Sequence, residues 1–448
     1  MAGPWREPLV AAKADVGAAP GGRKTTVRRR ARPLPRRWDI YEEHLSEAGF
    51  LWTQWQAAMQ GPESTMAEIQ AGEEERLRAH LHALVLGGMP VRKELLLPAL
   101  ADEDPERAFA AAAALLAADE GDFGALVVDA LTNAPPDAHA GFEGAFVLAP
   151  RDRLASITSE LLAAESTDLQ AMGLRVLGER PDVLVSADAL EPHLQQGDPR
   201  LLAPALRALP GVAAPAHTAY IERALGGSDA EVAEAAMEAG CVLGLASAWR
   251  AARRAVETRA ALAGRAPLLL AVRGNQPDVT LLVEAASHKK LRREVLWALG
   301  FTGSWVAIEA CVRYVADGKV AKLAGEALAT ITGVDLRRER LVVPPDEDED
   351  DEAGSAPEDG LPMPDPVAVS AWWESRRSSW RPMVRHLDGQ PWSNAVLLDA
   401  FERGSARRWA GLTVAAAVAS RGAARISART WASERRRALL AARPLLGA

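Results

Sequence analysis

Apolar residues along most of this chain recur at helical spacing, in short segments that end at glycine, proline or aspartate. Residues 290–333 show the pattern most clearly. There REVLWALGFTG ends at Gly303, AGEALATITG ends at Gly333, and a further apolar helix over 305–315 lies between them. Glycine ends helices because it adopts the left-handed conformation without steric cost. The stretch therefore predicts a helical hairpin followed by the start of the next hairpin.

Similar helix ends recur along the chain at intervals of 27 to 34 residues. Alanine- and leucine-rich helices are predicted to end at Leu116, Leu148, Leu177, Leu209, Leu243, Val272, Leu299 and Ala329. Such an interval fits two helices and two short turns. Asp104, Asp198 and Asp229 precede three of these helices as candidate N-caps, the first two followed by proline.

A single alanine-rich hairpin leaves an apolar stripe on both sides, and only stacking on neighbouring hairpins covers these stripes. The recurring helix ends therefore predict an all-α protein built on an α-solenoid of stacked helical hairpins over residues 90–340. The text of the helix ends resembles the second helix of HEAT repeats, as in VLGER, ALPG, VLGL and ALGF. The resemblance implies a HEAT-like array.

Different segments flank this array. Residues 37–89 predict an N-terminal helical pair, with one helix over 38–59 and a second over 66–86. Residues 1–36 lack an apolar period and predict a disordered basic tail, either simply solvated or tethering the chain to nucleic acid or lipid headgroups. Residues 341–366 contain seven consecutive acidic residues and predict a flexible linker.

Charge is distributed unevenly along the chain, whose net charge is −8. Residues 1–37 hold ten basic and two acidic residues, a net of +8. Residues 371–448 hold fourteen arginines and five acidic residues, a net of +9, whereas residues 38–340 hold 28 basic and 43 acidic residues, a net of −15. Two basic ends thus flank an acidic body, so we expect the ends to dock on that body or on an acidic partner.

Residues 367–448 predict a small helical module that contains six of the thirteen tryptophans. A helix is expected over 367–381, ended by Pro382. Its candidate partner-binding residues are Trp372, Trp373, Arg376, Arg377, Trp380 and Arg381. Interleaved tryptophan and arginine anchor protein partners and stack on bases. We favour another interpretation, in which the tryptophans fill a helical core and the arginines pair with the linker or the array.

Motifs for catalysis do not occur in the sequence. It contains no phosphate-binding loop, no G-x-S-x-G elbow and no H-E-x-x-H helix. HEAT-like di-iron hydroxylases use His-Glu pairs, and no His-Glu dipeptide occurs here. HEAT-like DNA glycosylases need a basic concave channel, whereas the array is acidic. We therefore predict neither enzymatic activity, nor a cofactor, nor a metal site.

Cellular context follows from the cysteines and from the longest apolar run. Cys241 and Cys311 lie in apolar helical segments and are predicted to be buried and reduced. The longest apolar run, 108–118, has eleven residues, too few to span a bilayer. No signal peptide is visible. A cytoplasmic location without membrane insertion is expected.

Three blocks together resemble an uncharacterised bacterial family of HEAT-like repeat proteins. They are EEHLSEAGFLW with EEERLRAHLHALVLGG, AGEALATITGVDL with the acidic run, and LPMPDPVAVSAWWESRRSSW with SARRWAGLTVAAAV and ISARTWASERR. Genes of this family often lie beside type VI secretion components. The resemblance implies an accessory role in loading a secretion effector, and it carries over no catalytic residue.

The expected function is that of a non-enzymatic scaffold or adaptor that binds a protein, such as a secretion effector or spike component. A nucleic-acid-binding protein that uses the basic ends is the alternative from another class. An immunity-type protein that neutralises a neighbouring effector is a third.

Overall fold

The computed structural model describes residues 37–62, 64–119, 121–183, 185–212, 217–259, 264–344, 358 and 360–448. These residues are helical apart from turns, two isolated bridges and one short hairpin of β1 (His386–Leu387) and β2 (Gln390–Pro391). The prediction of an all-α protein is confirmed. The predicted tail, 1–36, and most of the predicted acidic linker lie outside the described residues.

Two long helices begin the described chain. The first is α1 (Trp38–Ala58). The second runs without a break through α2 (Met66–Ile69), the π-helical turn η1 (Gln70–Glu74) and α3 (Glu75–Leu86). Thr65 and Glu68 form a reciprocal capping box at its start, because each side chain hydrogen-bonds the other's backbone N–H. Both predicted helices are confirmed.

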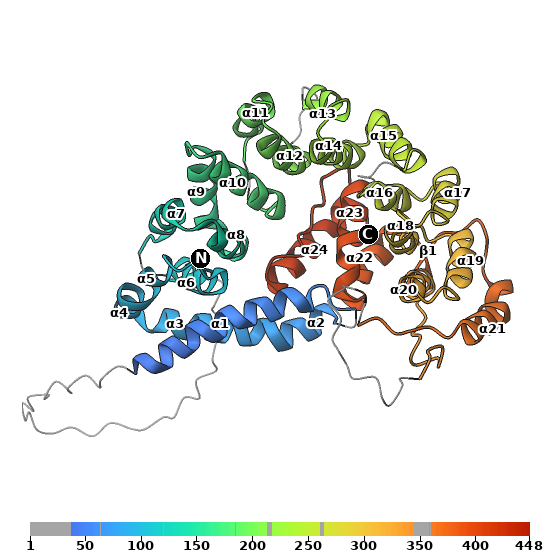
Figure 1. Ribbon diagram of the computed structural model, residues 1–448, viewed down its shortest axis with the longest axis horizontal. Helices are drawn as coiled ribbons and strands as arrows, with labels where there is room; N and C mark the ends of the chain where they lie inside the picture. The colour runs from blue at the N-terminus through green and yellow to red at the C-terminus, as the bar shows by residue number, and fades with distance from the viewer. Residues whose placement is uncertain are drawn as a thin grey trace, which may run out of the picture.

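Helical hairpins follow and form an arc (Figure 1). A helix made of α4 (Gly88–Val91), η2 (Arg92–Leu96) and α5 (Leu97–Ala99) opens the series. The outer helices are α7 (Gly124–Asn133), α9 (Arg151–Leu162), α11 (Ala187–Gln195), α13 (Thr218–Leu225), α15 (Ala246–Glu257), α17 (Gln276–Ala285) and α19 (Trp305–Tyr314). The inner helices are α6 (Pro105–Ala117), α8 (His139–Leu148), α10 (Thr167–Glu179), α12 (Pro199–Ala208), α14 (Ala230–Val242), α16 (Ala266–Arg273), α18 (Arg292–Leu299) and α20 (Ala321–Thr332). Short 3₁₀ turns, η3 (Pro136–Ala138) and η4 (Leu209–Gly211), join two of them to their neighbours.

The inner helices are the alanine-rich helices whose ends recur in the sequence. Each predicted end lies within a few residues of the observed end of one inner helix. The predicted caps are also confirmed, since the side chains of Asp104, Asp198 and Asp229 accept hydrogen bonds from backbone N–H groups of the first turn. Inner helices are buried on most sides, as over 108–116 of α6, whereas outer helices such as α9 bury one face.

Small residues let neighbouring inner helices approach closely. At Gly141 of α8, an added Cβ would lie 2.0 Å from the carbonyl oxygen of Pro105. The backbone of α6 cannot retreat from that contact without moving the packed helix, so overpacking is costly. Gly178 of α10 is a matched helical position, because an added Cβ there meets nothing within 4 Å.

We expect Gly141→Ala to lower the free energy of unfolding by about 1–3 kcal/mol. Gly178→Ala should leave it unchanged or raise it by up to about 1 kcal/mol, since alanine has the higher helix propensity. Urea denaturation of both variants checks the difference. Equal stability of the two variants would contradict the close packing of α6 on α8.

After α20 the chain leaves the arc and then returns into it. Helix α21 (Pro366–Arg376) and the 3₁₀ turn η6 (Arg377–Ser379) pack beside α19 at the end of the arc. The hairpin of β1 and β2 follows. Then α22 (Asn394–Arg403), η7 (Ala406–Arg408), α23 (Trp409–Ala419) and α24 (Ala432–Leu446) lie inside the arc, drawn in red in Figure 1. Residues 385–448 are called the inner module below.

The predicted helix over 367–381 is too long. Helix α21 ends at Arg376, and Trp380 has an extended backbone. The hydroxyl of Ser379 donates to the carbonyl of Arg376 at 2.7 Å and competes with the helical pattern there. Trp380 also packs on His386, with ring centroids 4.4 Å apart. The predicted helix is therefore wrong at its C-terminal end, and Trp380 lies outside α21.

Candidate binding groove between the arc and the inner module

The inner module donates hydrogen bonds to the C-terminal ends of the inner helices. These ends form one row, because outer and inner helices alternate and all inner helices run in the same direction. Their carbonyl groups lack partners within the helix and carry partial negative charge. The inner module therefore meets a row of acceptors along the arc.

At the far end of the row, the β-hairpin supplies backbone donors. The N–H of His386 donates to the carbonyl of Gly303 at 2.8 Å. Those of Asp388 and Gly389 donate to the carbonyls of Thr330 and Ile331, at 2.9 and 3.0 Å. These contacts join the hairpin to the ends of α18 and α20.

Side chains continue the row toward the start of the arc. The Arg425 guanidinium donates to the carbonyl of Gly178 at 2.9 Å, at the end of α10, and to that of Ala208 at 3.3 Å, at the end of α12. The indole N–H of Trp431 donates to the carbonyl of Leu148 at 3.0 Å, at the end of α8. The inner module thus crosses the arc from its last hairpin back to its first hairpins.

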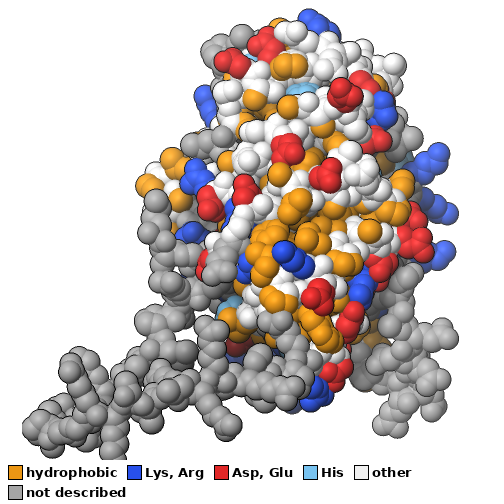
Figure 2. Space-filling view, turned by 90° about the vertical axis from the view of Figure 1, so that its left-hand side faces the viewer, with side chains coloured by type: hydrophobic (Ala, Val, Ile, Leu, Met, Phe, Trp, Pro, Cys, Tyr) orange, Lys and Arg blue, Asp and Glu red, His pale blue; other side chains and the backbone are white. Residues whose placement is uncertain are grey.

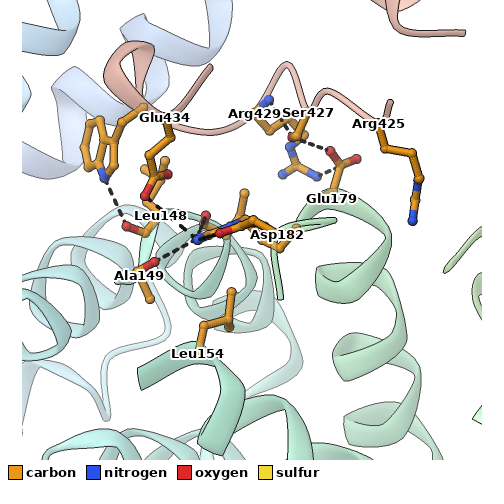
Figure 3. A network of polar contacts seen from close by, with 12 residues as sticks. Leu148, Ala149, Leu154, Glu179, Asp182, Arg425, Ser427, Arg429 and Glu434 are labelled. Carbon is orange, nitrogen blue, oxygen red and sulfur yellow. Dashed lines mark hydrogen bonds and ion pairs between the residues drawn. The ribbon is translucent and has the colours of Figure 1, made fainter. Parts of the chain in front are cut away.

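A polar cluster holds this crossing at α8 and α10 (Figure 3). The buried Arg180 donates to the carbonyls of Val147 and Ala149, at 2.8 and 2.7 Å, and pairs with Asp182 at 2.8 Å. Glu434 of the inner module lies 3.9 Å from the same guanidinium. Burial raises the pKa of the Glu434 carboxyl, and Arg180 acts in the opposite direction. Five residues, four from the arc and one from the inner module, therefore share one site.

Contact with the N-terminal helices closes the path. Glu74, in the π-helical turn, and Arg435 form an ion pair of 3.2 Å between side chains that are each 1% exposed. The N–H of Ala432 donates to the same carboxylate at 2.8 Å. Burial raises the pKa of Glu74, with Arg435 opposing, and burial lowers the pKa of Arg435 to about 10. The inner module is thus fixed both to the arc and to the N-terminal helices.

Between these contacts, the inner module and the arc leave a groove in two adjoining parts. The first part, about 490 Å³, lies against α8, α10, α12 and α14. The second, about 710 Å³, lies between α1, α16, α18 and α20. Both parts are lined by Arg265, Ala410, Ala428 and Arg429, so they meet there. We call the two parts together the central groove.

Arginines dominate the polar lining of the central groove. Its cations are Arg175, Arg207, Arg265, Arg293, Arg407, Arg425 and Arg429, against the carboxylates Glu143, Glu179, Glu238, Glu294 and Glu358. Where the two parts meet, Arg265 pairs with Glu238 at 3.0 Å and Arg429 lies 3.8 Å from Glu143. Both arginine side chains keep close to half of their surface exposed, at 48% and 45%. The lining thus holds more arginines than glutamates although the body of the chain is acidic, and two of these arginines, Arg207 and Arg407, pair with Glu231 and Glu326 outside the lining.

The second part of the groove has an apolar wall. Trp55, Met59, Leu268, Trp297 and Leu323 line it. Trp297 and Met59 are half-buried, while the other three are buried. An apolar wall beside half-exposed guanidinium groups can hold a hydrophobic side chain and an adjacent anion together.

The residues predicted to bind a partner lie elsewhere, on α21 and the turn after it. Trp372 and Trp373 are buried, and the indole N–H of Trp373 donates to the Glu309 carboxylate at 2.9 Å. Arg377 pairs with the same carboxylate at 3.3 Å. Both indoles therefore pack within the chain and offer little surface to a partner.

The remaining predicted residues are more open. Arg376 pairs with Glu339 at 3.3 Å, Trp380 is half-buried, and Arg381 is exposed. These contacts match the favoured interpretation, in which tryptophans fill a core and arginines pair with the array. A partner role for the exposed arginines stays a prediction.

Sequence reasoning missed the residues of the central groove. Arg265, Arg293 and Arg429 stand in unrelated segments, and no spacing links them to Trp55 or Trp297. The one available signal was the opposite charge of the arc and the C-terminal segment. The expectation that the basic C-terminal end docks on the acidic body is confirmed by the pairs Arg407–Glu326 and Arg435–Glu74.

The surface outside the groove mixes hydrophobic and charged side chains. Figure 2 views the end of the arc formed by α4, α5 and α7, where hydrophobic side chains gather among charges of both signs. Exposed large apolar residues in this part of the chain include Leu86, Met89 and Leu126. Leu126 on α7, 47% exposed, marks a convex position away from the groove.

Other candidate chemistry is limited in the described residues. Cys241 and Cys311 are buried free thiols as predicted, and burial raises the pKa of Cys311 to about 12. The Nδ1 atoms of His44 and His80 lie 3.2 Å apart, yet no group of three or more potential metal-binding side chains gathers anywhere in the described ranges. Among the helices that the structure describes, none is long and apolar enough to span a bilayer.

Comparison with models of protein families finds no match, and comparison with curated proteins finds none either. Among solved structures, the crystal structure of an engineered protein from the Northeast Structural Genomics Consortium is similar over 82% of this chain and 98% of that chain. Its identity is 17% and its TM-score is 0.30, so this likeness carries no argument about fold or function.

Proposed function

We propose that this chain is a non-enzymatic scaffold that holds a segment of a partner protein in the central groove. The observation that carries the proposal is the continuity of the groove, whose two parts meet at Arg265 and Arg429. It passes inner helices from both halves of the arc, and an elongated site of this kind suits an extended chain. Its wall combines apolar side chains with guanidinium donors, the types that anchor protein partners.

The resemblance to the HEAT-like family extends this proposal to a cellular role. The partner would be a secretion effector or spike component, and the chain an adaptor that acts in the cytoplasm before secretion. The basic C-terminal segment supports the scaffold over the nucleic-acid alternative, because many of its arginines contact the chain itself. Arg385, Arg425 and Arg435 are examples.

Photo-crosslinking in native cells tests the proposal. A photoreactive amino acid at Thr413, which lines the groove on α23, is compared with the same amino acid at Leu126 on the convex surface. We expect a discrete protein to be captured from Thr413 and not from Leu126. Capture from neither position, or equal capture of the same proteins from both, would exclude a groove-bound partner.

A further inference from the structure

One carboxylate of the chain itself, that of Glu358, already lies in the central groove. Glu358 is the first residue of a turn in which the N–H of Leu361 donates to its carbonyl at 3.0 Å, and its side chain forms an ion pair with Arg293 of α18. Its side chain is only 13% exposed. The apolar wall lies next to it, since Trp297 stands one helical turn after Arg293 and lines the same part of the groove. The groove therefore accepts a carboxylate beside its apolar wall.

Two further arginines of the groove have exposed guanidinium groups that a second carboxylate can contact. Arg265 and Arg429 stand where the two parts of the groove meet, and each is close to half exposed. Arg429 holds its acidic neighbours loosely, at 3.8 Å from Glu143 and 4.0 Å from Glu179. Glu143 and Glu179 therefore do not use all the N–H donors of Arg429, and a carboxylate from a partner could accept hydrogen bonds from the remaining donors.

We propose that the central groove binds an acidic peptide segment of a partner protein, with one apolar side chain seated on the wall of Trp297, Leu268 and Leu323. Carboxylates on either side of that anchor pair with Arg293 on one flank and with Arg265 and Arg429 on the other. Glu358 occupies the first carboxylate position in the free chain and competes with the partner. This proposal rests on the proposed scaffold function and names its partner class.

Charge and shape favour this occupant. The lining holds more arginines than glutamates, so an acidic segment gains and a basic segment is repelled. The groove has room for a side chain against the apolar wall. A simple anion has no apolar group to place there. An arginine guanidinium can donate two parallel hydrogen bonds to one carboxylate. The site would therefore select its ligand by geometry as well as by charge.

Fluorescence anisotropy on the full chain tests the proposal. The probe is a fluorescein-labelled peptide with a central leucine between two runs of glutamate. Its twins replace every glutamate by lysine, or the leucine by serine. We expect the glutamate–leucine peptide to bind most tightly, the serine twin to bind several-fold more weakly, and the lysine twin not to bind. Rising salt should weaken binding.

Variants of the chain locate the site. The double change Arg265→Glu and Arg429→Glu is expected to weaken binding about tenfold, because two attractive contacts become repulsive. Arg254→Glu, at an exposed position of the outer helix α15, is the matched control and should bind as the parent does. Glu358→Gln should tighten binding several-fold, because it frees Arg293. A gain of affinity cannot arise from misfolding.

Several outcomes would overturn the proposal. They are equal binding of the lysine twin, unchanged affinity in both the arginine and the Glu358→Gln variants, or loss of affinity in Arg254→Glu as well. Tight binding of a labelled single-stranded oligonucleotide that is lost in the double variant would assign the groove to nucleic acid instead. If Thr413 captures a protein in cells but the acidic peptide fails, the scaffold function stands and the acidic partner class falls.

Discussion

Replacing Arg435 by leucine is expected to lower the free energy of unfolding by about 3–5 kcal/mol. The change leaves the Glu74 carboxylate buried without its cation, and an unpaired buried charge is strongly destabilising. It also removes the guanidinium that lies 4.8 Å from the ring centroid of Trp409. The loss should be concentrated at the junction of the inner module with the N-terminal helices.

Urea denaturation measures this effect, and two further variants interpret it. Arg436→Leu removes the neighbouring arginine, which hydrogen-bonds Gln70 at the surface, and should change stability by less than about 0.5 kcal/mol. Adding Glu74→Leu to Arg435→Leu should restore a large part of the loss, because the second change removes the orphaned charge. Strictly additive losses in the double variant would show that the two side chains do not act as a pair.

The same pair predicts a pH dependence with a definite sign. Burial raises the pKa of Glu74 in the folded state, so the folded state binds this proton more tightly than the unfolded state. The contribution of this group to stability therefore falls as pH rises from the ordinary carboxyl range through the raised value. Arg435→Leu removes the opposing attraction and raises that pKa further. The deficit of the variant should then be smaller at about pH 5 than at about pH 8.

Local signals explain why the helices of the arc could be predicted. An aspartate cap such as Asp198 and a glycine end such as Gly333 act on the helix in which they stand. Alanine-rich runs identify the inner helices because only small residues permit contacts such as Gly141 with Pro105. Each of these signals lies within one hairpin, so no knowledge of distant residues was needed.

The groove depends on distant residues, and for that reason it could not be predicted. Arg425 meets the carbonyl of Ala208 across more than two hundred positions, and its partner is a backbone atom that leaves no mark in the sequence. The overlong helix at 367–381 failed for a related reason. Trp380 is held by His386 of the following hairpin, and this tertiary contact outweighed the local helical pattern.

Replacing Arg385 is the second change expected to have a large effect on stability. The positive charge of this residue is balanced by backbone dipoles. Its guanidinium donates to the carbonyls of Thr302 at 2.8 Å, Phe301 at 3.1 Å and Val272 at 3.2 Å, at the ends of α18 and α16. Burial lowers its pKa to about 10, so it is still charged near neutral pH. Within the described residues none of the ion pairs includes it. The negative ends of two helices therefore take the place of a carboxylate.

The position of Gly274 supports this arrangement. It ends α16 in the left-handed conformation, with φ +63°, and an added Cβ would lie 2.2 Å from the guanidinium carbon of Arg385. Glycine thus both permits the turn and leaves room for the arginine. The stem of Arg385 also places the charge over Trp392, 4.2 Å from its ring centroid. The site therefore fits the long side chain and planar guanidinium group of an arginine.

We expect Arg385→Leu to lower the free energy of unfolding by about 2–4 kcal/mol, because several buried carbonyls lose a charged donor together. Arg385→Lys keeps the charge but cannot reach both helix ends, and should lose about 1–2 kcal/mol. Arg381→Leu, at an exposed position nearby, is the control and should stay within about 0.5 kcal/mol of the parent. Hydrogen exchange adds a local measurement, since the amides of His386, Asp388 and Gly389 should lose protection in Arg385→Leu. Unchanged stability together with unchanged protection of these amides would mean that the β-hairpin docks on the arc without the guanidinium.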